Sequence, residues 1–180
     1  MKFGTLFSAL LISSAGLAFS TAAPAADKTQ VVKVLGGKAT VELPVEFVRM
    51  PKAIFKVIYG EEEDRPQEAW YVEKEGGNVF ISLNILDEEL KEAMIPMVTA
   101  TMKNEWSEYS PSMSQVKVNS HKMGRLEFNV PDDEGKGHTH TMIQVSSFNG
   151  KMMLVEYYVR SELESKYKPA GRVALSSLKY

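Results

Sequence analysis

Apolar and polar residues alternate along several short stretches of this chain, which is the pattern of β-strands. The clearest pair of stretches lies within His138 to Arg160, on either side of Asn149-Gly150. Asn followed by Gly favours a two-residue type I′ turn, because both residues tolerate positive φ. We therefore predict a β-hairpin in which Phe148 pairs with Lys151.

Both faces of this predicted hairpin carry apolar side chains. One face holds Met142, Gln144, Ser146, Met153, Val155, Tyr157 and Val159, and the other holds Ile143, Val145, Met152, Leu154 and Tyr158. A sheet with one face in water shows apolar residues mainly on the other face. Both faces must therefore be covered, and we expect helices above and below the sheet.

Gly-Gly pairs predict two further hairpins, one over residues 31–43 and one over residues 68–85. In the second of these we expect Val72 to pair with Ile81, which places a continuous row of apolar residues on one face.

Weaker patterns predict additional strands. Residues 115–120 and 125–130 read as two strands joined around residues 121–124. Residues 53–59 also fit a short strand. These strands would extend the same antiparallel sheet.

Two segments have helical spacing. The first is predicted to begin with Asp87 as its N-cap, and Pro96 should kink or interrupt it. The second follows Ser161, where the sequence Ser-Glu-Leu-Glu matches a capping box, and should run to about Ser177. The predicted fold class is α+β, with a central antiparallel sheet flanked by helices on both faces.

The N-terminal residues have the pattern of a secretory signal peptide. Lys2 precedes an apolar run over residues 6–19, and Ala23-Pro24-Ala25 supplies a small-residue cleavage site. We expect cleavage after Ala25, with Ala26 as the neighbouring alternative. Residues 1–25 would then be removed, and residues 26–180 would form a single domain without a transmembrane span.

The charge and the lack of Cys argue against several classes of function. The formal net charge of −2 argues against a nucleic-acid partner. The chain has no Cys, which excludes disulfides, thiolate metal sites, cysteine nucleophiles and an acylated lipoprotein anchor.

His138 and His140 are the one candidate metal site. Residues two apart on a strand point to the same side, and acidic residues lie just upstream. The alternative is a pair of solvated imidazoles at the rim of the sheet, which the lack of a nameable third ligand favours. His121 could join them only by tertiary proximity.

No sequence motif identifies a reaction. The chain lacks a G-x-S-x-G elbow, an H-E-x-x-H pair and a dinucleotide fingerprint. We therefore expect no enzymatic activity and no cofactor.

Several short motifs occur in a familiar order. They are Leu35-Gly36-Gly37-Lys38 leading into Val41-Glu42-Leu43-Pro44, then Ala69-Trp70-Tyr71, His121-Lys122-Met123 and Asn149-Gly150. In this order the chain resembles the DcrB-like periplasmic proteins, whose fold belongs to the PsbP-like α/β/α sandwich group. The resemblance implies a central antiparallel sheet with helices on both sides, and a non-enzymatic role in the cell envelope. DcrB resembles a lipoprotein, whereas this chain has no cysteine to acylate.

These observations predict a soluble periplasmic binding or accessory protein that contacts an envelope or secreted protein. The alternatives are a protein that binds a small ligand or a metal, and a partner-binding protein of the chaperone, immunity or virulence type.

Overall fold

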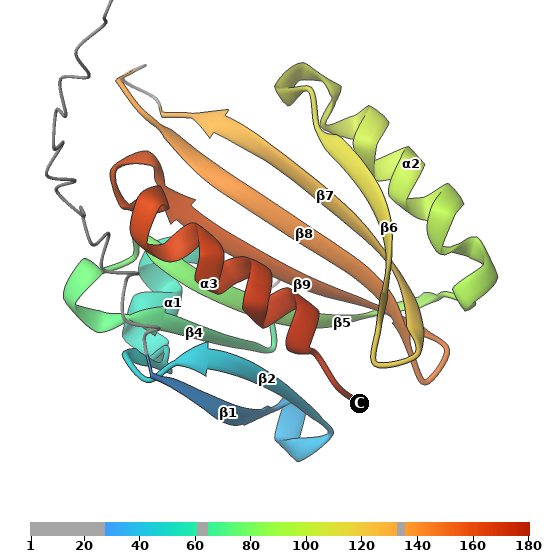
Figure 1. The fold of residues 1–180 in the computed structure, drawn as a ribbon, viewed down its shortest axis with the longest axis horizontal. Coiled ribbons are helices and arrows are strands. Elements are labelled where there is room, and N and C mark those ends of the chain that lie inside the picture. The colour runs from blue at the N-terminus through green and yellow to red at the C-terminus, as the bar shows by residue number, and fades with distance from the viewer. Residues whose placement is uncertain (1–27, 61–64, 133–135) are drawn as a thin grey trace, which may run out of the picture.

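A seven-stranded antiparallel sheet forms the centre of the molecule (Figure 1). The structure is a computed structural model that describes residues 28–60, 65–132 and 136–180. In spatial order the strands are β3 (Phe47–Arg49), β4 (Glu68–Val72), β5 (Val79–Glu89), β9 (Lys151–Arg160), β8 (His138–Phe148), β7 (His121–Pro131) and β6 (Ser112–Val118). This architecture confirms the predicted fold class.

The β8–β9 hairpin has the predicted register. Phe148 pairs with Lys151, and the turn residues Asn149 and Gly150 have φ values of 52° and 81°. Its strands occupy the middle of the sheet, so both of their faces can be buried.

One face of the sheet, which we call the α3 face, is covered by two elements. Helix α3 (Glu164–Ser177) lies in front of the sheet in Figure 1. Beside it is a separate two-stranded sheet of β1 (Thr29–Val34) and β2 (Ala39–Pro44). Both contribute to one apolar core with the facing strands. A helix covers this face as predicted, and the β1–β2 sheet shares the cover with it.

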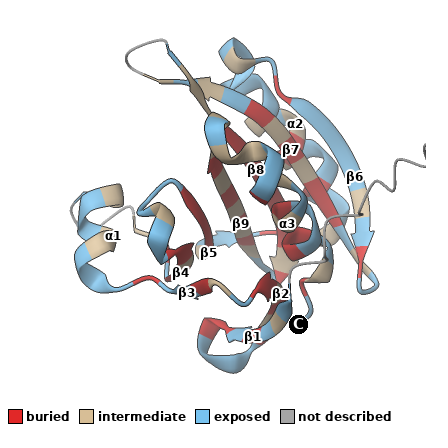
Figure 2. Cartoon of the chain, turned by 60° about the vertical axis from the view of Figure 1, so that its left-hand side comes forward, coloured by how far each residue is buried: buried red, intermediate tan, exposed pale blue. Residues whose placement is uncertain are grey.

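The opposite face, which we call the α2 face, is covered by helices α1 (Lys52–Tyr59) and α2 (Ile95–Glu105). They lie over two separate apolar clusters, one for each helix. Figure 2 shows how burial differs between α1 and the sheet. No residue of α1 is buried, whereas the inner strands are largely buried.

Residues 53–59 form helix α1, so the prediction of a strand there is wrong. Ile54, Phe55, Ile58 and Tyr59 recur at helical spacing and pack together against the sheet. An apolar run this short fits both periods, and tertiary packing decides between them.

The helix predicted at Asp87 begins later. Strand β5 continues to Glu89, and α2 starts at Ile95 with Pro96 in its first turn. A proline at that position costs no hydrogen bond, because the first helical N–H groups have no partner within the helix. Pro96 therefore starts the helix and does not kink it.

The second predicted helix is confirmed, but its start differs. A 3-10 turn over Ser161–Leu163 precedes α3, and the Ser161 hydroxyl accepts a hydrogen bond from the His138 N–H and donates one to Glu162. Gly171 lets α3 approach the sheet closely, since a Cβ at this position would lie 2.5 Å from the Tyr157 ring.

One strand pairing and one turn differ from the prediction. Trp70, not Val72, pairs with Ile81, a shift of two residues that leaves the same side chains on the same face. The turn between β6 and β7 lies at Asn119-Ser120, where both residues have positive φ, earlier than the expected connection.

The signal peptide and the cleavage residues Ala25 and Ala26 lie outside the described residues. Among the residues that the structure describes, no helix is long and apolar enough to cross a membrane.

Candidate functional site

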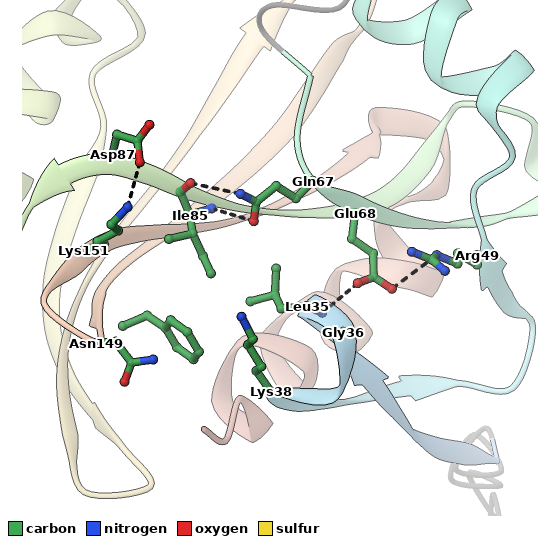
Figure 3. A pocket seen from close by; sticks show the side chains of 11 residues that line it. Leu35, Gly36, Lys38, Arg49, Gln67, Glu68, Ile85, Asp87, Asn149 and Lys151 are labelled. Carbon is green, nitrogen blue, oxygen red and sulfur yellow. Dashed lines mark hydrogen bonds and ion pairs between the residues drawn. The ribbon is translucent and has the colours of Figure 1, made fainter.

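A pocket of about 490 Å³ opens near the tip of the β1–β2 hairpin (Figure 3). Its wall also includes the start of β4, the end of β5 and the turn between β8 and β9. We call it the first pocket. It is assembled from segments that are distant in sequence.

Glu68, the first residue of β4, connects the hairpin tip to the sheet. The residue is only 5% exposed. Its Oε2 accepts a hydrogen bond of 2.7 Å from the Leu35 backbone N–H, and its Oε1 accepts one of 3.2 Å from Trp70 Nε1. Arg49 Nε lies 3.4 Å from the same Oε1. A buried carboxylate needs such partners, because burial without them is costly.

The hairpin tip has an unusual backbone. Leu35, Gly36 and Gly37 have φ values of 53°, 66° and 83°. The left-handed conformation costs about 1–2 kcal/mol for a residue with a side chain such as Leu35. The hydrogen bond from Leu35 to Glu68 helps to offset that cost, and holds the tip at the edge of the pocket.

The opposite wall is fixed by side chains from β5 and its neighbours. Gln67 exchanges two hydrogen bonds with the backbone of Ile85, at 3.2 and 3.3 Å. Asp87 Oδ1 lies 2.7 Å from Lys151 Nζ. Hydrogen bonding and charge from Lys151 lower the pKa of Asp87, and Asp87 raises the pKa of Lys151 in return. Asp87 is therefore ionised and paired.

A second pocket of about 480 Å³ adjoins the first. It is lined from the end of β3, the first turn of α1 and the segment before β4. Arg49, Gln67 and Glu68 line both pockets, so the two pockets meet at these residues. We refer to them together as the paired pockets.

The paired pockets offer charge, hydrogen bonds and apolar contact. None of the described residues that line them is Ser, Thr, Cys, His or Tyr, which include the usual nucleophiles and the commonest proton-transfer group. Their two carboxylates already have cationic partners. The described lining thus presents cationic, amide and apolar groups to a ligand.

The predicted metal residues lie elsewhere, on the α3 face. His138 Nε2 is 2.5 Å from Glu164 Oε1. His140 Nδ1 is 2.6 Å from Asn129 Oδ1, and its Nε2 is 3.0 Å from Glu127 Oε1. Both histidines face the same side of β8, as the spacing predicts.

His140 is only 3% exposed, so the alternative of a solvated imidazole is wrong for this residue. Burial lowers its pKa, and nearby Lys168 adds to that effect, while Glu127 and Glu164 oppose it. His121 begins β7, whereas His138 pairs with the last residue of that strand. His121 therefore lies far from the other two histidines.

Within the described ranges, no group of three or more His, Asp or Glu residues is arranged to hold a metal ion. Metal binding by His138 and His140 stays a prediction.

No sequence motif marks the paired pockets. One signal was available, because Glu68 shares the core-facing parity of Trp70 and Val72 along β4. A carboxylate at a core-facing position needs specific partners, which marks it as a position of interest.

The fold is similar to that of proteins of known structure. No protein-family model matches the chain, and no curated protein matches its sequence. The solution structure of cyanobacterial PsbP (CyanoP) from Synechocystis sp. PCC 6803 aligns with a TM-score of 0.55 at 14% identity, covering 91% of this chain and 99% of that one. The chain has the PsbP-like fold.

A crystal structure from Bacteroides thetaiotaomicron VPI-5482 also aligns, with a TM-score of 0.51 at 6% identity. It covers 83% of this chain, which spans 47% of that longer chain. At these identities the likeness concerns the fold, and it confirms the α/β/α sandwich that the resemblance implied.

Proposed function

We propose that this chain is a non-enzymatic accessory protein that binds a protein or peptide at the paired pockets. The observation that carries the proposal is the make-up of these pockets. Their carboxylates are paired, their lining offers cations and apolar surface, and no Ser, Thr, Cys, His or Tyr occurs among the described residues of that lining. One fold can support many functions, so the proposal rests on the residues of the site and not on the PsbP-like fold.

The proposed location is the periplasm, where the partner would be an envelope or secreted protein. The support is the pattern of residues 1–25, with one basic residue, an apolar run and a small-residue cleavage site. N-terminal sequencing of the exported chain tests this location directly. A mature N-terminus at Ala26 or Asp27 is expected, and retention of residues 1–25 would contradict it.

Crosslinking in intact cells followed by affinity capture tests the binding role. The full chain should return the same protein partner in repeated captures. A variant with Lys38→Glu and Lys52→Glu, one in each pocket, should lose that partner. A control variant with Lys103→Glu and Lys117→Glu, which has the same net charge, should retain it. Repeated captures without a specific partner, or equal loss in both variants, would contradict the proposal.

The size of the first pocket favours one alternative, a small-ligand binder. Its volume of about 490 Å³ lies within the range of roughly 300–1,000 Å³ that is usual for such sites. Native mass spectrometry of the purified chain separates the two functions. A retained small molecule would support the alternative, and bare protein would remove it.

A further inference from the structure

Positive charge gathers around the paired pockets of a chain whose net charge is −2. Among the described residues that line them, five are cationic and two are acidic, a formal surplus of three positive charges in that described lining. The cations are Lys38, Arg49, Lys52, Arg65 and Lys151, and the acids are Glu68 and Asp87. The charge of the described lining is therefore opposite to that of the chain as a whole.

The two acids already have partners within the protein. Glu68 is buried beneath Arg49 and bonded to Leu35 and Trp70. Asp87 pairs with Lys151. Neither carboxylate is left to neutralise Lys38 or Lys52.

Three of the cations keep donors available. Lys38 and Lys52 are exposed, and their ammonium groups make no ion pair or hydrogen bond within the described part of the chain. The Arg49 side chain is 68% exposed and contacts Glu68 through Nε. No residue in the described part of the chain pairs with its terminal N–H groups, and a guanidinium suits a carboxylate in particular.

The positions of these three cations indicate the shape of the ligand. Lys38 lines the first pocket, Lys52 lines the second, and Arg49 lines both. A single small anion in one pocket would meet Arg49 and the lysine of that pocket only. A ligand that reaches all three must be elongated and carry several negative charges.

Each pocket also provides one aromatic side chain for apolar contact, Phe148 in the first and Phe55 in the second. We infer that the paired pockets bind an extended acidic segment of a partner protein, rich in Asp and Glu, which crosses Arg49 from one pocket to the other. This inference rests on the proposed function and specifies the partner's chemistry.

Fluorescence polarisation with the full mature chain tests this inference. The probe is a short labelled peptide rich in Glu and Asp, and the control peptide has Gln and Asn at the same positions. The acidic peptide should bind and the neutral one should not. Binding should weaken as salt is raised, because exposed charge pairs are screened. Inorganic phosphate at millimolar concentration should compete only weakly.

Two variants with the same net charge locate the binding. The Lys38→Glu, Lys52→Glu variant should bind the acidic peptide about tenfold more weakly, since several exposed ion pairs are lost or reversed. The Lys103→Glu, Lys117→Glu control changes exposed lysines on α2 and β6, and should bind like the original chain. Equal weakening in both variants would show binding to overall charge and would overturn the inference.

Three other outcomes would overturn it. The first is equal binding of the neutral peptide, and the second is full displacement by phosphate, which would indicate a simple anion site. The third is peptide binding only after residues 61–64, the chain's own Glu-Glu-Glu-Asp run, are replaced by neutral residues. If the acidic peptide fails while cellular capture still depends on Lys38 and Lys52, the inference falls and the proposed function stands. If capture fails as well, both fall.

Discussion

Glu68 accepts a hydrogen bond of 2.7 Å from the backbone N–H of Leu35, which lies 33 residues earlier in the chain. This contact joins the tip of the β1–β2 hairpin to the first residue of β4. It therefore sets the position of one wall of the first pocket relative to the sheet.

Replacing Glu68 by Ala should lower the free energy of unfolding by about 1–3 kcal/mol, because the Leu35 and Trp70 N–H groups would lose their acceptor. Chemical denaturation followed by circular dichroism measures the change. Glu68→Gln retains one acceptor oxygen and should lose less. Exposed Glu105→Ala on α2 is the control and should have little effect. A Glu68→Ala variant as stable as the original chain would show that water satisfies these groups.

Gly124 on β7 allows α2 to contact the sheet. A Cβ at Gly124 would lie 1.8 Å from Thr99 Oγ1, which is buried and bonded to the Ile95 carbonyl. Gly124→Ala should therefore destabilise the fold by about 1–3 kcal/mol through overpacking. Combining it with Thr99→Ala removes the closest clashing atom and should recover part of the loss. If the effects of the two substitutions on the free energy of unfolding simply add, the proposed contact between Gly124 and Thr99 is contradicted.

The Asn149-Gly150 turn should be sensitive at its second residue. Gly150 has φ of 81°, and a Cβ there would meet no atom within 4 Å, so backbone conformation alone opposes a side chain. Gly150→Ala should cost about 1 kcal/mol, observed as a lower urea midpoint. Asn149→Gly keeps the type I′ turn accessible and serves as the control. Equal midpoints for Gly150→Ala and the original chain would mean that another turn replaces this one.

Glu156 is half-buried on the central strand β9, facing the α2 side of the sheet. Its Oε2 accepts a hydrogen bond of 3.2 Å from Ser82 Oγ. Burial raises its pKa above the usual value of 4.5. The folded state therefore binds this proton more tightly than the unfolded state does, and the free energy of unfolding should fall as the pH rises above 4.5.

Glu156→Gln removes this titration. At pH 8 the variant should be more stable than the original chain, and the difference should shrink as the pH approaches 4. Urea unfolding at several pH values gives both curves, with Glu105→Gln as an exposed control. A difference that does not vary with pH, or a Gln variant less stable at pH 8, would contradict the role given to burial.

Local sequence patterns predicted the parts of this fold that depend on neighbouring residues. The Asn149-Gly150 turn fixed the register of β8 and β9, and the two apolar faces of that hairpin required covering layers on both sides. The pattern was insufficient over residues 53–59, where a short apolar run fits a strand and a helix alike. The same patterns wrongly predicted a helix start at Asp87. Asp is a good N-cap residue, but it can also lie within a strand, as it does here in β5.

Local sequence patterns could not predict the paired pockets. Lys38 lies in the β1–β2 connection, whereas Arg49 and Lys52 flank the start of α1, and tertiary packing brings these two segments to Glu68. The histidines show the converse case. Their spacing correctly placed His138 and His140 on one side of a strand, but not the burial of His140 under α3, which depends on a helix that follows later in the chain.

Site-specific photocrosslinking tests most directly whether the paired pockets are a protein-binding site. A photoreactive amino acid at Lys38, which is exposed in the first pocket, would be compared with the same group at Lys103 on α2, in the full chain expressed in its native cells. We expect position 38 to form a discrete crosslink to one protein, and position 103 to form none to that protein. No crosslink at position 38, or the same crosslinks at both positions, would contradict the account.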